Sequence, residues 1–111
     1  MRRFPSIKKN SEFRTIYRNG RSCADQLFVL YAQPNGTGKN RLGVSVSKKI
    51  GNSVVRHRIV RLMREAFRLH ATDMEQGYDL VVIARDPKAA ESYAAAERSY
   101  LHLTERLRLR K

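Results

Sequence analysis

The fold is decided by residues 41–68, RLGVSVSKKIGNSVVRHRIVRLMREAFR, in which the hydrophobic pattern changes its period once. Over residues 41–47 large apolar residues alternate with small or polar ones, which predicts a half-buried strand. Residues 54–69 instead repeat at helical spacing, which predicts a helix that follows Gly51-Asn52-Ser53 and runs to about Leu69. The packed strand face carries Leu42, Val44 and Val46, and the small polar face carries Arg41, Gly43, Ser45 and Ser47.

The predicted helix is amphipathic, with a cationic outer face. At about 3.6 residues per turn its apolar side chains share one side. They are Val55, Ile59, Leu62, Met63, Ala66 and Phe67, and the opposite side carries His57, Arg58, Arg61, Arg64 and Arg68. The only carboxylate in the helix is Glu65, so we expect these arginines to lack the acidic partners of an ordinary solvated helix. Their charge would then be left for a ligand.

Further positive charge crowds the start of this helix, at Lys48, Lys49, Arg56 and Arg58. The helix dipole disfavours cations there by about 0.3–1 kcal/mol each, so the concentration suits a bound phosphate. Residues 50–70 contain five Arg and no Lys, a choice that favours bidentate phosphate contacts and stacking on bases. The alternative is that the arginines only keep the surface solvated.

Net charge points to the same class of partner. The 111 residues hold 23 Lys plus Arg against 10 Asp plus Glu, a net charge of +13 that favours a polyanion such as nucleic acid. Residues 1–68 carry the whole excess, because residues 69–111 hold seven basic and seven acidic side chains. No polyanion is needed to explain the apolar stripe in that last third, so we assign it no binding role; its residues are Tyr93, Tyr100, Leu103 and Leu107.

Composition also limits the other classes of function. The length fits a single domain, residues 1–111. Cys23 has no second cysteine for a disulfide or a zinc site, and no apolar run suits a signal peptide or membrane span, so we expect a soluble, cytoplasmic protein. The three histidines and scattered carboxylates form no HExxH motif, no paired-carboxylate spacing and no glycine-rich phosphate loop. We expect no catalytic residue and no metal site made by the protein alone.

The remaining elements surround the central stretch. A first helix over residues 10–18, capped by Asn10 or Ser11 and stopped by a left-handed Asn19-Gly20, would place Phe13, Ile16 and Tyr17 on one face. Residues 26–32 predict a strand, 34–38 a turn, and 41–47 the returning strand. A strand over 78–84 and a last helix from about Ala89 follow, and the core stripe of that helix is Tyr93, Ala96, Tyr100, Leu103 and Leu107. The order αββαβα, with a possible extra short strand, predicts an α+β fold, a small two-layer sandwich.

Residues 41–68 resemble the signature of the bacterial ribonuclease P protein family. Residues 10–20, 28–31 and 78–85 resemble the first helix, first strand and a later strand of that family. The resemblance implies the protein subunit of an endoribonuclease holoenzyme, whose RNA subunit hydrolyses precursor tRNA with Mg²⁺ while the protein binds that RNA and the single-stranded 5′ leader. It also implies a left-handed crossover around the central helix. His57 stands where the family usually has Asn, and Val60 where it usually has a basic residue.

The resemblance assigns two sets of site residues. Those for the catalytic RNA are Lys48, Lys49, Arg56, His57, Arg58, Arg61, Arg64 and Arg68. Those for a leader cleft between the first helix and the sheet are Phe13, Tyr17, Phe28, Tyr31, Ser45 and Ser47. Aromatic rings stack on any base for about 1–3 kcal/mol each, which suits varied leaders, although each aromatic could instead pack in the core. The partners expected are the catalytic RNA and precursor tRNA, with no membrane and no required protein oligomer. A structural RNA-binding protein of ribosomal type is the rival interpretation.

Overall fold

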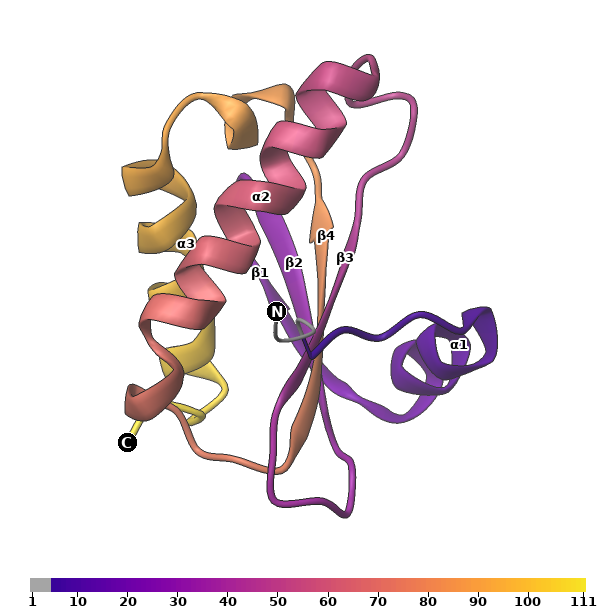
Figure 1. Cartoon of the computed structure of the whole chain (residues 1–111), viewed down its shortest axis with the longest axis vertical. Helices are drawn as coiled ribbons and strands as arrows, with labels where there is room; N and C mark the ends of the chain where they lie inside the picture. The colour runs from indigo at the N-terminus through magenta and orange to yellow at the C-terminus, as the bar shows by residue number, and fades with distance from the viewer. Residues whose placement is uncertain (1–4) are drawn as a thin grey trace.

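A computed structural model describes residues 5–111 and confirms the α+β class (Figure 1). One four-stranded sheet in the order β1-β2-β4-β3 carries α2 and α3 on one face and α1 on the other. The elements are α1 (Asn10–Asn19), β1 (Arg21–Ala24), β2 (Phe28–Pro34), β3 (Arg41–Ser45), α2 (Ser53–Leu69), η1 (Ala71–Asp73), β4 (Tyr78–Ala84), η2 (Pro87–Ala90) and α3 (Tyr93–Arg106). None of the helices in this described part is long and apolar enough to cross a membrane.

The strand pairing differs from the simple return that the sequence suggested. β3 does not pair with β2, because β4 lies between them, antiparallel to β2 and parallel to β3. Parallel neighbours need a crossover connection, and α2 supplies it. β1 is the extra short strand, paired antiparallel with the other edge of β2. The left-handed crossover stays a prediction.

The larger core lies between the sheet and the pair α2 and α3. Leu30 and Val82, which are partners in the β2–β4 ladder, face Ile59 and Met63 from α2, and all four are at most 1 % exposed. The stripe predicted for α3 is confirmed, since Ala96, Tyr100, Leu103 and Leu107 are buried and Tyr93 is half-buried. A smaller core of Ile7, Ile16 and Val81 holds α1 against the opposite face of the sheet.

Helix ends are partly as predicted. Asn52 caps α2 by accepting a hydrogen bond from the Val55 backbone N–H at 3.0 Å. The predicted cap of α1 is wrong, because Lys9 occupies the cap position and makes no side-chain cap bond. The left-handed stop is also wrong, since Gly20 is extended with φ −76°. Glycine suits this position for lack of space, because a Cβ would lie 2.6 Å from the Ile16 carbonyl oxygen.

β3 ends at Ser45 rather than at residue 47, and the starts of two other elements shift for local reasons. β2 begins at Phe28 rather than at residue 26, because the Asp25 carboxylate accepts hydrogen bonds from the Leu27 and Phe28 N–H groups and holds a turn there. The last helix does not begin near residue 89. Residues 87–90 form the separate 3₁₀ turn η2, and α3 starts after Ser92, whose hydroxyl caps it.

Candidate nucleic-acid interface

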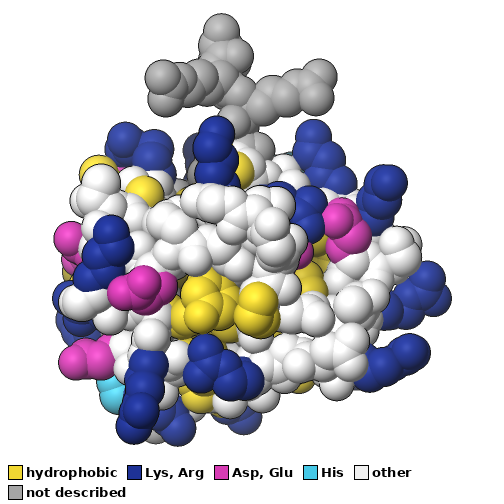
Figure 2. Space-filling view, turned by 90° about the horizontal axis from the view of Figure 1, so that it is seen from below, with side chains coloured by type: hydrophobic (Ala, Val, Ile, Leu, Met, Phe, Trp, Pro, Cys, Tyr) yellow, Lys and Arg dark blue, Asp and Glu magenta, His cyan; other side chains and the backbone are white. Residues whose placement is uncertain are grey.

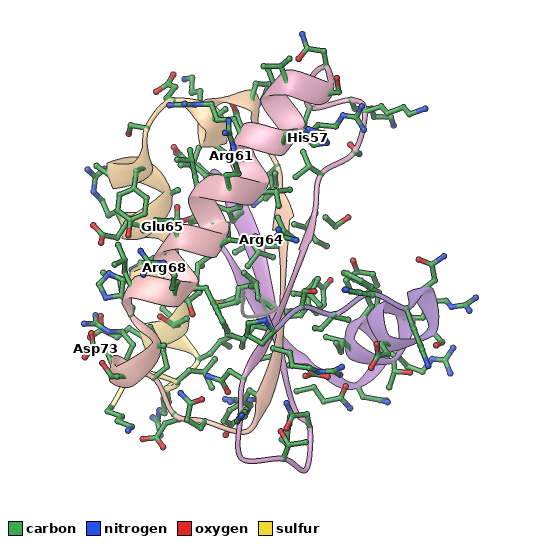
Figure 3. The ribbon with its side chains drawn as sticks, viewed as in Figure 1. His57, Arg61, Arg64, Glu65, Arg68 and Asp73 are labelled. Atoms are coloured by element: carbon green, nitrogen blue, oxygen red, sulfur yellow. The ribbon has the colours of Figure 1, made fainter. Side chains whose placement is uncertain are left out.

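The outer face of α2 is the first candidate surface. Figure 3 shows His57, Arg61, Arg64 and Arg68 following one another along this helix, and all four are exposed. Three of them, together with two valines, line a shallow hollow of about 590 Å³. Its lining residues are Val54, His57, Val60, Arg61 and Arg64. Amphipathic winding therefore produces the cationic face that the sequence predicted.

Four of the side chains predicted to bind the catalytic RNA, two Lys, one His and one Arg, have no hydrogen-bond or ion-pair partner within residues 5–111. Lys48 and Lys49 are exposed in the turn that precedes the helix, and His57 and Arg61 are exposed on its first turns. None of the four makes a hydrogen bond or ion pair with a described residue. Their donors are available to phosphate oxygens.

The expectation that all these arginines lack partners is wrong for Arg68, which forms an ion pair with Glu65 one helical turn earlier. The hydrogen bond from Arg68 lowers the pKa of the Glu65 carboxyl. Arg58 is held differently, because its Nε donates to the Ala90 carbonyl at 2.5 Å and its Nη2 donates to that of Glu91 at 3.4 Å. Carbonyls do not neutralise a guanidinium, so Arg58 keeps its charge.

Arg56 presents an unsatisfied donor. Its Nε is buried and has no hydrogen-bond partner among residues 5–111. A buried polar group without a partner costs about 1–3 kcal/mol, so an acceptor supplied by a ligand that reaches this atom would recover free energy. The donor lies in the first turn of α2, the region in which the sequence concentrates positive charge.

The second candidate surface is a groove of about 470 Å³ between α1 and β3, lined by Asn10, Phe13, Arg14, Tyr17, Val44 and Ser45. The ring centroids of Phe13 and Tyr17 are 6.3 Å apart, and those of Tyr17 and Tyr31 are 5.1 Å apart in an edge contact. Tyr17 is 37 % exposed, so much of this aromatic side chain faces solvent rather than the core. An aromatic cluster with a positive rim can bind single-stranded nucleic acid.

The groove is held open by close packing under Phe13. A Cβ on Gly43 of β3 would lie 2.7 Å from the Phe13 Cζ, so this ring rests directly on the backbone of the strand. Arg41 joins the same strand to α1 through a 2.8 Å contact with Glu12, and it binds Asp79 of β4 with Nε–Oδ1 and Nη2–Oδ2 distances of 2.9 and 2.6 Å. Burial alone would raise the pKa of Asp79, but hydrogen bonds from Arg41 and Asn35 outweigh it and lower that pKa.

The tyrosine hydroxyl in the groove stays neutral. Burial raises the pKa of Tyr17, and a hydrogen bond with the Ser45 side chain opposes that rise without cancelling it. A neutral phenol beside Arg14 adds a flat stacking surface without repelling phosphate. The arrangement combines stacking and charge within one groove.

Two residues predicted for the leader cleft lie elsewhere. Phe28 is 0 % exposed and belongs to the larger core, because it points to the same side of β2 as Leu30. Ser47 is exposed two residues beyond the end of β3 and does not line the groove. Tyr31 contributes through its contact with Tyr17 rather than as a lining residue.

Sequence reasoning missed Asn10 and Arg14 as groove residues. A signal was present, because Asn10, Arg14 and Tyr17 are spaced i, i+4 and i+7 and so share one face of α1. Positive charge is not confined to α1 and α2, since Arg85, Lys88 and Arg98 are exposed on other segments. Figure 2 shows Lys and Arg side chains around most of the rim of the face seen from below. Within residues 5–111, no three His, Cys, Asp or Glu side chains gather as a metal site.

Comparison with known proteins identifies the family. The sequence model of the Ribonuclease P family matches residues 1–108. The chain belongs to the ribonuclease P protein family. It is 50% identical over 107 residues to the ribonuclease P protein component of Clostridium kluyveri, covering 95% of this chain and 96% of that one. It is 38% identical over 109 residues to that of Alkaliphilus oremlandii, covering 98% and 96%.

Solved structures of the family share this fold. The ribonuclease P protein of Staphylococcus aureus superposes with a TM-score of 0.88 at 36% identity, covering 98% of this chain and 100% of that one. The protein of Thermotoga maritima gives a TM-score of 0.83 at 28% identity, covering 91% and 96%. The chain is therefore a ribonuclease P protein component with the α+β fold of its family, and its role lies in tRNA processing within a ribonucleoprotein.

Proposed function

We propose that the protein binds two RNA segments on opposite faces of its sheet. The outer face of α2 and the turn before it bind the catalytic RNA of ribonuclease P, and the groove between α1 and β3 binds the 5′ leader of precursor tRNA. The RNA subunit carries out hydrolysis with Mg²⁺, in the cytoplasm and without a second protein subunit. The protein supplies affinity and selects precursor over mature tRNA.

Free charge supports the assignment of α2. Lys48, Lys49 and Arg61 have no partner among the described residues, and Arg56 has a buried Nε without an acceptor. Each phosphate that such a group neutralises releases counterions, so binding should be strong and dependent on salt. Arginine in particular suits bidentate phosphate contacts.

The shape of the groove supports the assignment of the leader. Phe13 and Tyr17 offer stacking surfaces that accept any base, and Arg14 is placed to meet the backbone. Because α1 and α2 cover opposite faces of the sheet, a leader in the groove would not displace RNA from α2. Contacts with the leader exist only for a precursor, so they raise the affinity for substrate over product.

The observation that carries the proposal is a group of cations on and before α2 that lack a partner among residues 5–111, together with a separate aromatic groove on the other face; the cations are Lys48, Lys49 and Arg61. A structural RNA-binding protein of ribosomal type would share the charge but would have no use for the groove. The two functions therefore predict different behaviour toward a substrate with and without its leader.

The test is cleavage of precursor tRNA by the ribonuclease P RNA of Clostridium kluyveri at low Mg²⁺, with and without this protein. We expect the protein to stimulate cleavage of a precursor with a full leader, and to stimulate less when the leader is cut to one nucleotide. Tyr17→Ala should reduce the first effect to the level of the second, whereas Arg108→Gln, which alters an exposed cation outside both surfaces, should not. Absence of any stimulation would favour the structural alternative.

A further inference from the structure

The last third of the chain is balanced in charge, but the structure does not pair that charge evenly. Several of its acidic side chains already have basic partners, one of them outside residues 69–111 and two within them. Asp79 binds Arg41, Glu97 accepts from His70 at 2.8 Å, and Glu105 lies 3.5 Å from Arg110. Other cations of the same third are left without an acidic partner.

Four Arg or Lys side chains and one His surround the turn between β1 and β2, and we call them the turn patch. They come from the residue that follows β4, from η2 and from α3, and all are exposed. None forms an ion pair with a carboxylate among residues 5–111. The turn patch consists of Arg85, Lys88, Arg98, His102 and Arg106.

Two hollows meet at this turn and share residues 25–27. The first, of about 380 Å³, is lined by Arg98 and His102 from α3, and the second, of about 490 Å³, by Arg85 and Lys88. The carboxylates in them are already engaged. Asp25 accepts hydrogen bonds from two backbone N–H groups and from the Ser99 hydroxyl, and Asp86 accepts from the Lys88 backbone N–H. Four Arg or Lys side chains against these two carboxylates leave the surface positive.

Two of the arginines are held in place by carbonyl groups. Arg85 Nη1 donates to the Asp25 carbonyl at 2.7 Å, and Arg106 Nη1 donates to the Ala24 carbonyl at 2.9 Å. Each bond uses one of the five guanidinium donors and neutralises no charge. The remaining donors are ordered in advance, so less conformational entropy is lost when they bind an anion.

The turn patch is continuous with the start of α2. Arg58 of α2 donates to the carbonyl of Ala90, the last residue of η2, and Lys88 lies in that same turn. Arg58 and Lys88 therefore link the first turns of α2, over η2, to the turn between β1 and β2, with the exposed Glu91 as the carboxylate on this path. The hollows at this turn are lined by cations without the aromatic rings of the α1 groove, which suits backbone phosphates rather than bases.

We infer that the RNA bound on α2 extends across η2 and that the turn patch binds its phosphate backbone. This inference rests on the proposed function, because it extends the surface assigned to the catalytic RNA. The turn patch adds affinity and orientation without reading sequence. It lies on the α2 and α3 side of the sheet and takes no part in binding the leader.

The test compares two double variants of the full chain with equal loss of charge. Lys88→Gln with Arg98→Gln removes two turn-patch cations that make no side-chain hydrogen bond or ion pair with residues 5–111. Arg108→Gln with Lys111→Gln is the matched control, at the chain end that pairs with η1 at the far end of α2. The measurement is the affinity for the Clostridium kluyveri ribonuclease P RNA in a salt series from about 0.05 to about 0.3 M. This series brackets physiological ionic strength.

Two fewer phosphate contacts should make the slope of log K against log salt shallower by about 1.4–1.8, which weakens binding roughly 15- to 30-fold at 0.15 M salt. The control should lose less than about 3-fold. The inference would be overturned if both variants lost affinity for the RNA equally, or if the turn-patch variant kept the wild-type affinity. In either case binding of the RNA by the wild-type protein would still uphold the proposed function. Failure of the wild-type protein to bind this RNA would instead overturn the proposed function. Hydroxyl-radical cleavage from Fe–EDTA tethered at Gln26→Cys, in a Cys23→Ser background, should cut the RNA nearby, and no cut would also count against the inference.

Discussion

Adding a single methyl group at Gly43 tests how the leader groove is built. A Cβ there would lie 2.7 and 2.9 Å from two atoms of the Phe13 ring and 3.3 Å from the Ile7 Cβ. Ordinary carbon contacts are about 3.5–4.0 Å, so Gly43→Ala must push the ring outward by about 1 Å. Overpacking of this kind costs about 1–3 kcal/mol. For a chain of this length that is a drop in Tm of roughly 4–12 °C.

The displaced ring lies on the wall of the groove, so binding should suffer as well as stability. We expect Gly43→Ala to weaken holoenzyme binding to a precursor tRNA with a full leader, and to leave its binding to mature tRNA unchanged. Gly38→Ala is the matched control, because no atom lies within 4 Å of a Cβ at that position. Thermal unfolding and tRNA binding would be measured on the same preparations.

A second substitution separates packing from stacking. Adding Phe13→Leu to Gly43→Ala removes part of the ring that the methyl group strikes, so the double variant should regain most of the lost Tm. Its affinity for the leader should stay low, because a leucine does not stack on bases. The reasoning would be refuted if Gly43→Ala left both Tm and leader binding unchanged, or if the double variant regained leader affinity.

Three further predictions concern stability. Asp79→Asn should lower the free energy of unfolding in urea by about 2 kcal/mol, less than for a fully buried pair because Arg41 is partly exposed. That difference from wild type should shrink as the pH falls through the lowered pKa of Asp79, and a constant difference would contradict this. Tyr100→Phe removes a buried hydroxyl that has no partner among residues 5–111, so stability should rise by about 1 kcal/mol, and a fall would mean that the hydroxyl is satisfied. The hydrogen bond to Glu97 raises the pKa of His70, so wild type should have a larger free energy of unfolding than His70→Asn. This difference should be full below about pH 6.5 and should disappear as the pH rises through the raised pKa. A difference that grows with pH would contradict this linkage.

The parts of the fold that depend on neighbouring residues could be predicted from the sequence. α2 follows from its helical period and from the Asn52 cap, both of which are local. The partner of β3 could not be predicted in this way. Its alternation shows which face packs, but the insertion of β4 between β2 and β3 depends on contacts between segments far apart in the chain.

The site shows the same division between local and distant effects. Phe28 and Tyr31 look alike as aromatic residues of one strand, yet they lie an odd number of positions apart and so face opposite sides of the sheet. Counting charge in residues 69–111 failed for a different reason, because the pairing of acids with bases is set by tertiary contacts such as Asp79 with Arg41. A balanced count therefore concealed the turn patch.

Separate loss of the two binding activities would test the central claim most directly. Three proteins would be compared: wild type, Arg61→Ala and Tyr31→Ala. The first measurement is the affinity of each protein for the catalytic RNA across a salt series. The second is the affinity of each assembled holoenzyme for precursor and for mature tRNA. We predict that Arg61→Ala weakens protein binding to the catalytic RNA and flattens its salt dependence, while the precursor-to-mature ratio of the assembled complex stays unchanged. Tyr31→Ala should lower that ratio and leave binding to the catalytic RNA intact. If either variant impaired both activities equally, the assignment of two RNAs to two faces of the sheet would be contradicted.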